Sequence, residues 1–296
     1  MDLFGGRAMA FTIEGLSLRI LTFSGKKIES WYSVPLGPNL LRDGLVSAPD
    51  KVGEVMAEAI QTKSSPRSGV LCALPSAGST SQTLTLPQLS KGKLEDVVQR
   101  EVKRLVGGSA DTDYIYWQQL PAVGAAKKQA VYALAIPRNN VVNMVEVCRT
   151  AGVKIKGMEL KPFALTRAVN CKSGIIVHCE IDSIEIVIID KSFPALFRNI
   201  PVKDAKPGPD IACQNLLREL PFTIDYYNRS HPESNITPDT AIYMSGELAL
   251  DPEVIVRVSE ASGRTVTDVD PQVQCPPNFP LAQYIVNIGL MLREKW

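Results

Sequence analysis

The strand pattern that opens this sequence occurs again at its middle, and this repeat constrains the fold more than any other feature. Residues 11–23 alternate apolar and polar side chains, and residues 28–34 follow as a second strand after a turn at Gly25. Residues 174–180, 184–190 and 195–200 give three further strands. In each half, strands and helices then alternate. The repeat predicts a duplicated α/β fold.

A segment with a different order of strands and helices interrupts the first half. Residues 79–86 have a strand pattern, residues 93–106 form an amphipathic helix, and residues 114–119 and 130–136 form two more strands. This order predicts a small α+β insert. The expected division is therefore a first subdomain at 1–75, the insert at 76–152, a return to the first subdomain at 153–172, and the second half at 173–296.

Composition places the chain among globular proteins. Of its 296 residues, 45% are hydrophobic and 21% charged, and the formal net charge of +1 argues against nucleic acid or a bare membrane surface as the main partner. No apolar run approaches the ~20 residues of a membrane span, and the N-terminus has no signal pattern. Six cysteines without a C-x-x-C pair favour a reducing cytoplasm. His178 and His231 lack metal-ligand spacing, so a structural or surface role is expected.

The sequence contains none of the common catalytic motifs. The phosphate-loop pattern G-x-x-x-x-G-K-[ST], the nucleophile pattern G-x-S-x-G and the zinc pattern H-E-x-x-H are all missing. Enzymatic activity is left open, with a non-catalytic scaffold favoured.

Four stretches, in a fixed order, carry a resemblance to a known family. They are the helix LEDVVQREVKRLV at 94–106, the segment AGV…KPFALTRA at 151–168, IYMSG at 242–246 with VDP at 269–271, and NIGLMLRE at 287–294. The second is similar to the family segment AGL…E-P-x-A-L-x-R-A. In these stretches the chain resembles PilM, the actin-like protein of type IV pilus assembly, which is related in fold to FtsA. The resemblance implies an actin-like, ribonuclease H-like fold of two halves.

The chain departs from this family where nucleotide would bind. Each half of the family opens with Asp-x-Gly, whose glycine lets backbone N–H groups reach phosphate. Here Thr12 and Glu14 precede Gly15 in the first hairpin, and Glu180 and Asp182 stand in the second. In the third loop Gly246 is followed by Glu247 where the family has a further glycine.

These departures predict that ATP and Mg²⁺, the family ligands, are not bound. The alternative is an active ATPase in which the acids hold a metal ion in an unusual way. Only about a dozen residues separate Pro201 from the helix at Leu216, so the small subdomain of the second half is expected to be reduced.

The resemblance also implies a partner. PilM recruits the cytoplasmic tail of the inner-membrane protein PilN in a groove between the first subdomain and the insert, so a cytoplasmic location peripheral to the inner membrane is expected. Other pilus components and copies of the chain itself are further possible partners. A scaffold similar to the cytoplasmic part of GspL in type II secretion is the alternative. Candidate groove residues, for which a solvated helix face is the competing interpretation, are Leu84, Leu86, Arg100, Lys103 and Arg104.

Overall fold

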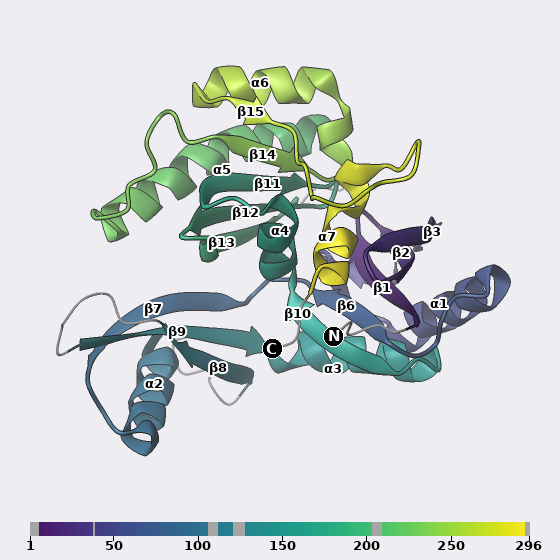
Figure 1. Ribbon diagram of the computed structural model, residues 1–296, viewed down its shortest axis with the longest axis horizontal. Helices are drawn as coiled ribbons and strands as arrows, with labels where there is room; N and C mark the ends of the chain where they lie inside the picture. Colours follow the sequence, from purple (N-terminus) through teal and green to yellow (C-terminus); the bar gives the residue numbers. More distant parts are fainter. Residues whose placement is uncertain (1–5, 38, 106–111, 121–127, 203–208, 294–296) are drawn as a thin grey trace. The chain divides into compact units, whose positions relative to one another are not determined.

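The computed structural model describes residues 6–37, 39–105, 112–120, 128–202 and 209–293. Its first five-stranded sheet has the order β10-β6-β1-β2-β3 (Figure 1). The three strands β1, β2 and β3 run antiparallel, while β6 pairs parallel with β1 and β10 parallel with β6. The bounds are β1 (Arg7–Glu14), β2 (Ser17–Ser24), β3 (Lys27–Pro35), β6 (Val70–Leu74) and β10 (Ile155–Leu160).

The second five-stranded sheet repeats this topology. Its order is β13-β12-β11-β14-β15, with an antiparallel meander of three strands followed by two parallel additions. The bounds are β11 (Ser173–Cys179), β12 (Ser183–Asp190), β13 (Phe193–Pro201), β14 (Ile242–Ser245) and β15 (Val266–Thr267). The duplication predicted from the strand pattern is therefore confirmed.

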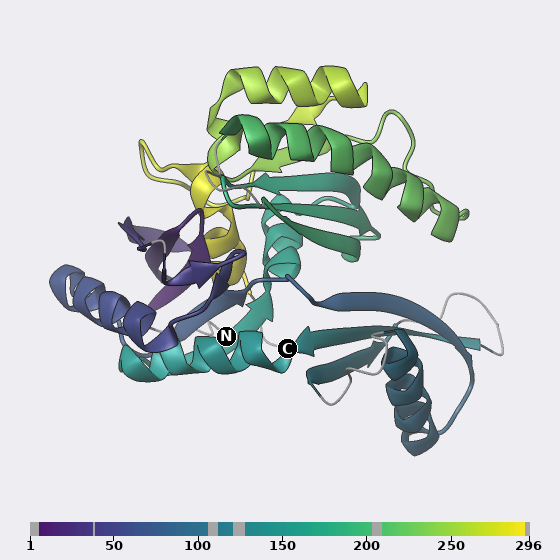
Figure 2. The same cartoon turned by 180° about the vertical axis from the view of Figure 1, so that it is seen from behind.

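Helices fill the space around the two sheets. The helices α4 (Lys161–Val169) and α7 (Leu281–Met291) pack against each other and contact strands of both sheets. On the other side of the second sheet, α5 (Pro209–Ser230) and α6 (Pro252–Ser262) lie side by side, as Figures 1 and 2 show. Apart from the strands and helix of the insert, the other elements are β4 (Leu41–Arg42), β5 (Leu45–Val46), α1 (Pro49–Lys63), α3 (Arg138–Thr150) and the 3-10 turn η2 (Glu247–Leu250).

The α4–α7 crossing depends on a glycine. Gly289 lies directly against the backbone carbonyl oxygen of Ala164, closer than a Cβ atom could approach. Both helices are almost fully buried, and Arg167 of α4 donates to the carbonyl oxygen of Gly289 at 2.6 Å. This close contact fixes α7, whose side chains reach the functional region described below.

The insert is a compact unit of its own, formed by residues 78–142. Its three strands have the order β7-β9-β8, and the buried face of α2 packs on one side of them. The bounds are β7 (Thr80–Pro87), α2 (Lys91–Leu105), β8 (Asp113–Gln119) and β9 (Lys128–Pro137). The unit lies within the predicted insert of residues 76–152, while the predicted domain boundaries themselves stay a prediction.

In the described part of the second half, the elements beyond its sheet are α5, α6, α7 and the 3-10 turn η2. Residues 202–208 connect β13 to α5, and the described part of this half contains no second sheet. Val106 and Glu294, which end two of the quoted motifs, lie outside the described residues. Among the residues that are described, no helix combines the length and the apolar character needed to cross a membrane.

Candidate functional site

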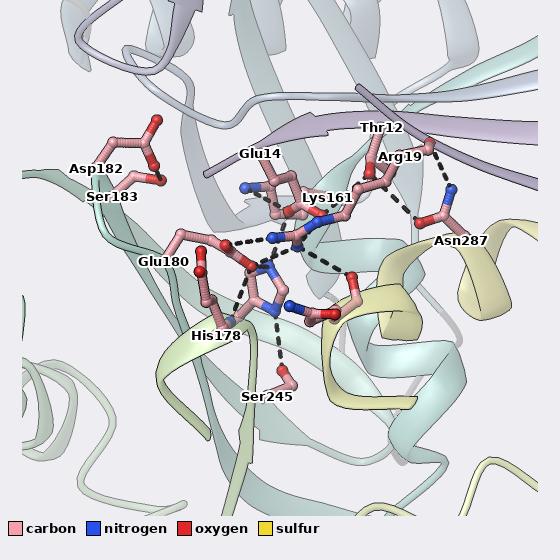
Figure 3. Close-up of polar contacts among 12 residues, drawn as sticks. Thr12, Glu14, Arg19, Lys161, His178, Glu180, Asp182, Ser183, Ser245 and Asn287 are labelled. Atoms are coloured by element: carbon pink, nitrogen blue, oxygen red, sulfur yellow. Dashed lines mark hydrogen bonds and ion pairs between the residues drawn. The ribbon is translucent and has the colours of Figure 1, made fainter. Parts of the chain in front are cut away.

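The ends of β1 and β11 meet in a buried cluster of charged side chains, which Figure 3 shows. Glu14 is the last residue of β1, and Glu180 directly follows β11. Both carboxylates are buried, with exposed fractions of 2% and 0%. Gly15 adopts φ +54° beside them, and a Cβ atom there would lie 2.5 Å from Oε2 of Glu180. The two hairpins singled out from the sequence therefore face each other.

An arginine from β2 neutralises Glu180. Arg19 Nη1 and Nη2 donate to Oε1 and Oε2 of Glu180, both at 2.6 Å. Such a bidentate pair is the strongest geometry for an arginine and a carboxylate. Arg19 Nη1 also donates to the carbonyl oxygen of Gln283 at 3.0 Å, and the backbone N–H of Glu247 donates to Oε1 of Glu180 at 3.3 Å. Four segments of the chain thus converge on one ion pair.

A second set of partners surrounds Glu14. Lys161 Nζ lies 2.9 Å from Oε1 of Glu14, and His178 Nε2 lies 2.8 Å from the same oxygen. Because an ionised carboxylate can only accept, Nε2 of His178 carries the hydrogen. Thr12 Oγ1 donates to the other oxygen, Oε2, at 3.1 Å. Both oxygens of Glu14 are therefore engaged by side chains of this protein.

Polar groups around the cluster complete its hydrogen bonds. Ser245 Oγ lies 3.0 Å from Nδ1 of His178, which fixes the ring. Glu185, a buried carboxylate of β12, accepts from Ser76 Oγ and from Asn199 Nδ2. The cluster, defined here as the charge network, consists of Glu14, Arg19, Lys161, His178, Glu180 and Glu185.

Burial and pairing shift the acidities of these groups in opposite directions. Burial alone would raise the pKa of Glu14, but Lys161, His178 and Arg19 outweigh it and hold that pKa far below its ordinary value. For Lys161 and Arg19, burial is outweighed by the neighbouring carboxylates, so both pKa values rise. Burial raises the pKa of Glu180 and of Glu185 despite their cationic neighbours. The two cations are thus held firmly in their charged forms.

The charge network does not fit a metal ion. One ligand atom each from Glu14, His178 and Glu180 lies within 4.8 Å of the others, a spacing that a metal could span. However, Lys161 and Arg19 already donate to these carboxylates, and a divalent cation would have to displace them or sit beside two positive charges. The paired positive charges of Lys161 and Arg19 therefore argue against a metal ion between the two acidic hairpins.

The predicted nucleotide-loop residues are brought together, with one exception. Thr12, Glu14, Gly15, Glu180 and Glu247 all lie in or beside the charge network. Asp182 does not join them, since its carboxylate accepts from the neighbouring Ser183 Oγ at 3.1 Å (Figure 3).

Gly246 has a packing role that is independent of any nucleotide. It adopts φ +89°, and a Cβ atom there would lie 2.5 Å from the carbonyl oxygen of Cys179.

The sequence did not reveal the basic partners. Arg19 interrupts a buried apolar strand, and a charge at such a position signals a buried counter-charge. Lys161 stands where the family segment quoted above has Glu, just as Glu14 stands where the family hairpin has Gly. Lys161 and Glu14 contact each other, so their opposite charges compensate. The presence of both substitutions in one sequence was the signal that could have revealed this ion pair. His178 was expected to be structural or at the surface, and it is buried.

The predicted partner-binding residues divide into two groups. Leu84 and Leu86 are buried in the core of the insert, where β7 packs under α2, and their role in partner binding stays a prediction. The alternation of β7 turns them inward. Arg100, Lys103 and Arg104 are exposed on α2.

The two sheets and the buried ends of their hairpins define an α/β protein of the actin-like class, as comparison with solved structures shows. A chain of a PilM–PilN type IV pilus biogenesis complex matches with a TM-score of 0.78 and 17% identity, covering 96% of this chain and 97% of that chain. The likeness to PilM predicted from the four sequence stretches is therefore confirmed at the level of the fold.

Two further solved structures share this fold. The cytoplasmic domain of EpsL from the type II secretion system of Vibrio cholerae matches with a TM-score of 0.57 and 10% identity over 98% of this chain and 97% of that one. A Bacteroides thetaiotaomicron protein with an actin-like ATPase fold and unknown function matches with a TM-score of 0.54 and 8% identity, covering 97% and 96%. No family model matches the sequence, and no curated protein matches it.

Proposed function

We propose that this protein is an actin-like scaffold of a type IV pilus or a related secretion machine that works without nucleotide. The observation that carries this proposal is the likeness to the PilM chain over nearly the full length of both proteins. The weaker likeness to the EpsL domain supports type II secretion as the second candidate. Under either candidate the protein would act at the cytoplasmic side of an inner membrane, and the pilus candidate would be held there by a partner.

The charge network supports the nucleotide-independent part of the proposal. Actin-like ATPases hold phosphate between the two hairpins, and here Glu14 and Glu180 fill that position. A phosphate charge 4 Å from an ionised glutamate would be repelled by about 4 kcal/mol at an effective dielectric near 20. The cations that could offset this repulsion are already paired with the glutamates. An active ATPase is therefore the less favoured alternative.

Calorimetry with ATP and Mg²⁺ at millimolar concentration tests the nucleotide part. We expect no heat of binding, and the same result for ADP. A dissociation constant in the micromolar range would reject the nucleotide-free proposal and restore the ATPase alternative. Thermal unfolding with and without ATP gives an independent reading, because a ligand bound to the native state raises the midpoint.

The proposed partner is the cytoplasmic tail of a PilN-like protein with one membrane span, bound to the insert. In the described strand order β7 lies at one end of its sheet, the position at which a peptide strand can be added. On α2, Arg100 and Arg104 are exposed, and the side chain of Arg104 is 82% accessible. Backbone pairing along β7 with charge contacts from α2 would hold an acidic or neutral tail.

Co-purification tests the partner. The tagged chain is expected to retain the single-span protein encoded beside it. The double variant Arg100→Glu with Arg104→Glu should weaken binding of its tail by about 1 kcal/mol, mostly by lowering the association rate. Lys27→Glu with Lys63→Glu makes the same change of charge on exposed residues of the other unit and should leave binding intact. Retention of the tail after deletion of residues 78–142 would place the partner site elsewhere.

A further inference from the structure

A pocket in the second half borders the charge network through Ser245, which lines the pocket and whose Oγ lies 3.0 Å from Nδ1 of His178. This pocket of about 450 Å³ is enclosed by β14, β15, η2 and the beginning of α7, and its volume is typical of ligand sites, which span ~300–1,000 Å³. Its walls are mainly apolar and include Met244, Leu250, Ile255, Val269, Phe279 and Ile285.

The mouth of the pocket exposes large apolar side chains. Leu250 lines the pocket and is 54% exposed, and Val256, which follows the pocket residue Ile255 in α6, is 52% exposed. A shallower hollow that shares Ile255 and Val266 with the pocket continues past Val256. The hydroxyl of Ser245 at the inner wall already has a hydrogen-bond partner, because its Oγ contacts His178. The pocket therefore offers apolar contact to a ligand.

The rim of the pocket is acidic. From Glu247 to Asp270 the chain has six acidic residues and two basic ones. Asp268 belongs to the pocket lining and is exposed, as are Asp251 and Asp270. Both basic residues have acceptors elsewhere: Arg264 donates to the carbonyl oxygens of Thr237 and Thr240, and Arg257 lies 4.0 Å from Asp210. The rim thus disfavours anions such as nucleotides or acidic lipid headgroups and favours cations.

The sheet edge beside the pocket suits an extended chain. In the described strand order β15 is the last strand, and it pairs on one side with β14. An extended peptide bound along such an edge presents alternate side chains to one face. One large apolar side chain could enter the pocket while its neighbours face the acidic rim.

We propose that this pocket binds a short extended peptide with one large apolar anchor flanked by lysine or arginine. This proposal does not rest on the pilus function, since the residues that carry it belong to neither the charge network nor the insert. It adds a second docking position to the scaffold, selective for a basic segment.

Fluorescence anisotropy with two labelled hexapeptides tests the proposal. Both carry a central leucine–phenylalanine pair, with lysines at the ends of one and glutamates at the ends of the other. The lysine peptide should bind at micromolar concentration, should weaken as salt is raised, and should bind at least about tenfold more tightly than the glutamate peptide. No binding, or equal binding of the two peptides, would overturn the proposal.

Variants locate the site on the protein. Leu250→Asp places a charge at the apolar mouth, and Asp268→Lys reverses one charge of the acidic rim. Each variant should lower the affinity for the lysine peptide by about tenfold. Val145→Asp is the matched control, because Val145 is 43% exposed on α3, away from this pocket. An undiminished affinity in Leu250→Asp would show that the peptide binds elsewhere and would reject the assignment of the pocket.

Discussion

Arg19 and Glu180 are 161 residues apart in the sequence and form a buried bidentate ion pair, with both nitrogen–oxygen distances at 2.6 Å. Arg19 belongs to the first sheet and Glu180 directly follows a strand of the second sheet, so this pair joins the two halves of the main unit. Together with the contacts of Glu14 to Lys161 and His178, it links the two hairpins through side chains of this protein.

Removing one partner of this pair should destabilise the fold strongly. Arg19→Met leaves Glu180 buried without its guanidinium, and breaking a buried ion pair in this way typically costs ~3–5 kcal/mol. The free energy of unfolding from urea titration measures the loss.

The double variant Arg19→Met with Glu180→Leu is the control for that prediction. It removes both charges and should recover much of the lost stability, because no unpaired charge remains. If the double variant is as unstable as the sum of the two single variants, the two side chains are not energetically coupled.

Glu14 and Asp182 should respond differently to loss of charge. Glu14→Gln leaves the buried ammonium of Lys161 without its closest counter-charge and should cost several kcal/mol, on the order of ~3. Asp182→Asn changes a carboxylate whose contact is local, with Ser183, and should cost less than ~1 kcal/mol. Equal losses in the two variants would contradict the separation of Asp182 from the charge network.

The pH dependence of stability should carry opposite signs for two buried glutamates. The pKa of Glu14 is lowered from its ordinary 4.5, so its contribution is complete above that value and is lost as the pH falls toward the folded pKa. The pKa of Glu185 is raised, so its ionisation costs stability as the pH rises from 4.5 through the folded pKa.

Urea titrations of the wild type, Glu14→Gln and Glu185→Gln between about pH 3 and pH 7 measure how the free energy of unfolding changes with pH. The stability advantage of the wild type over Glu14→Gln should shrink on acidification below about pH 4.5, whereas the wild type should lose stability relative to Glu185→Gln as the pH rises. Parallel curves for all three proteins would mean that neither carboxyl group is perturbed by folding.

The contact between α4 and α7 gives a steric prediction. Gly289→Ala would drive a methyl group into the carbonyl oxygen of Ala164 and force the helices apart, at a cost of at least ~1–3 kcal/mol. Gly92→Ala is the matched control, because nothing lies within 4 Å of a Cβ atom at that helical position and alanine is the better helix former. A thermal midpoint unchanged in Gly289→Ala would show that the helices adjust freely.

Much of the architecture could be predicted from local patterns. The apolar run around Ile186 predicted a strand correctly, because such runs are typical of buried strands. Residues 11–23, expected as one strand, instead fold back after Glu14 and contribute to both β1 and β2. Asp251 before Pro252 is a local signal for the start of α6, since the carboxylate of Asp251 accepts from the backbone N–H of Glu253 at 2.9 Å. These signals act over a few residues, so one sequence is enough to show them.

The sequence by itself determined that each half opens with strands, that an α+β segment interrupts the first half, and that acids stand in both hairpins, since each depends on residue type and short-range order. The tertiary structure alone decided which charges those acids meet. Arg19 and Lys161 reach Glu180 and Glu14 only because the two sheets and α4 bring distant segments together. A buried charge depends on its neighbours in space for stability, and here the neighbours lie more than 140 residues away along the chain.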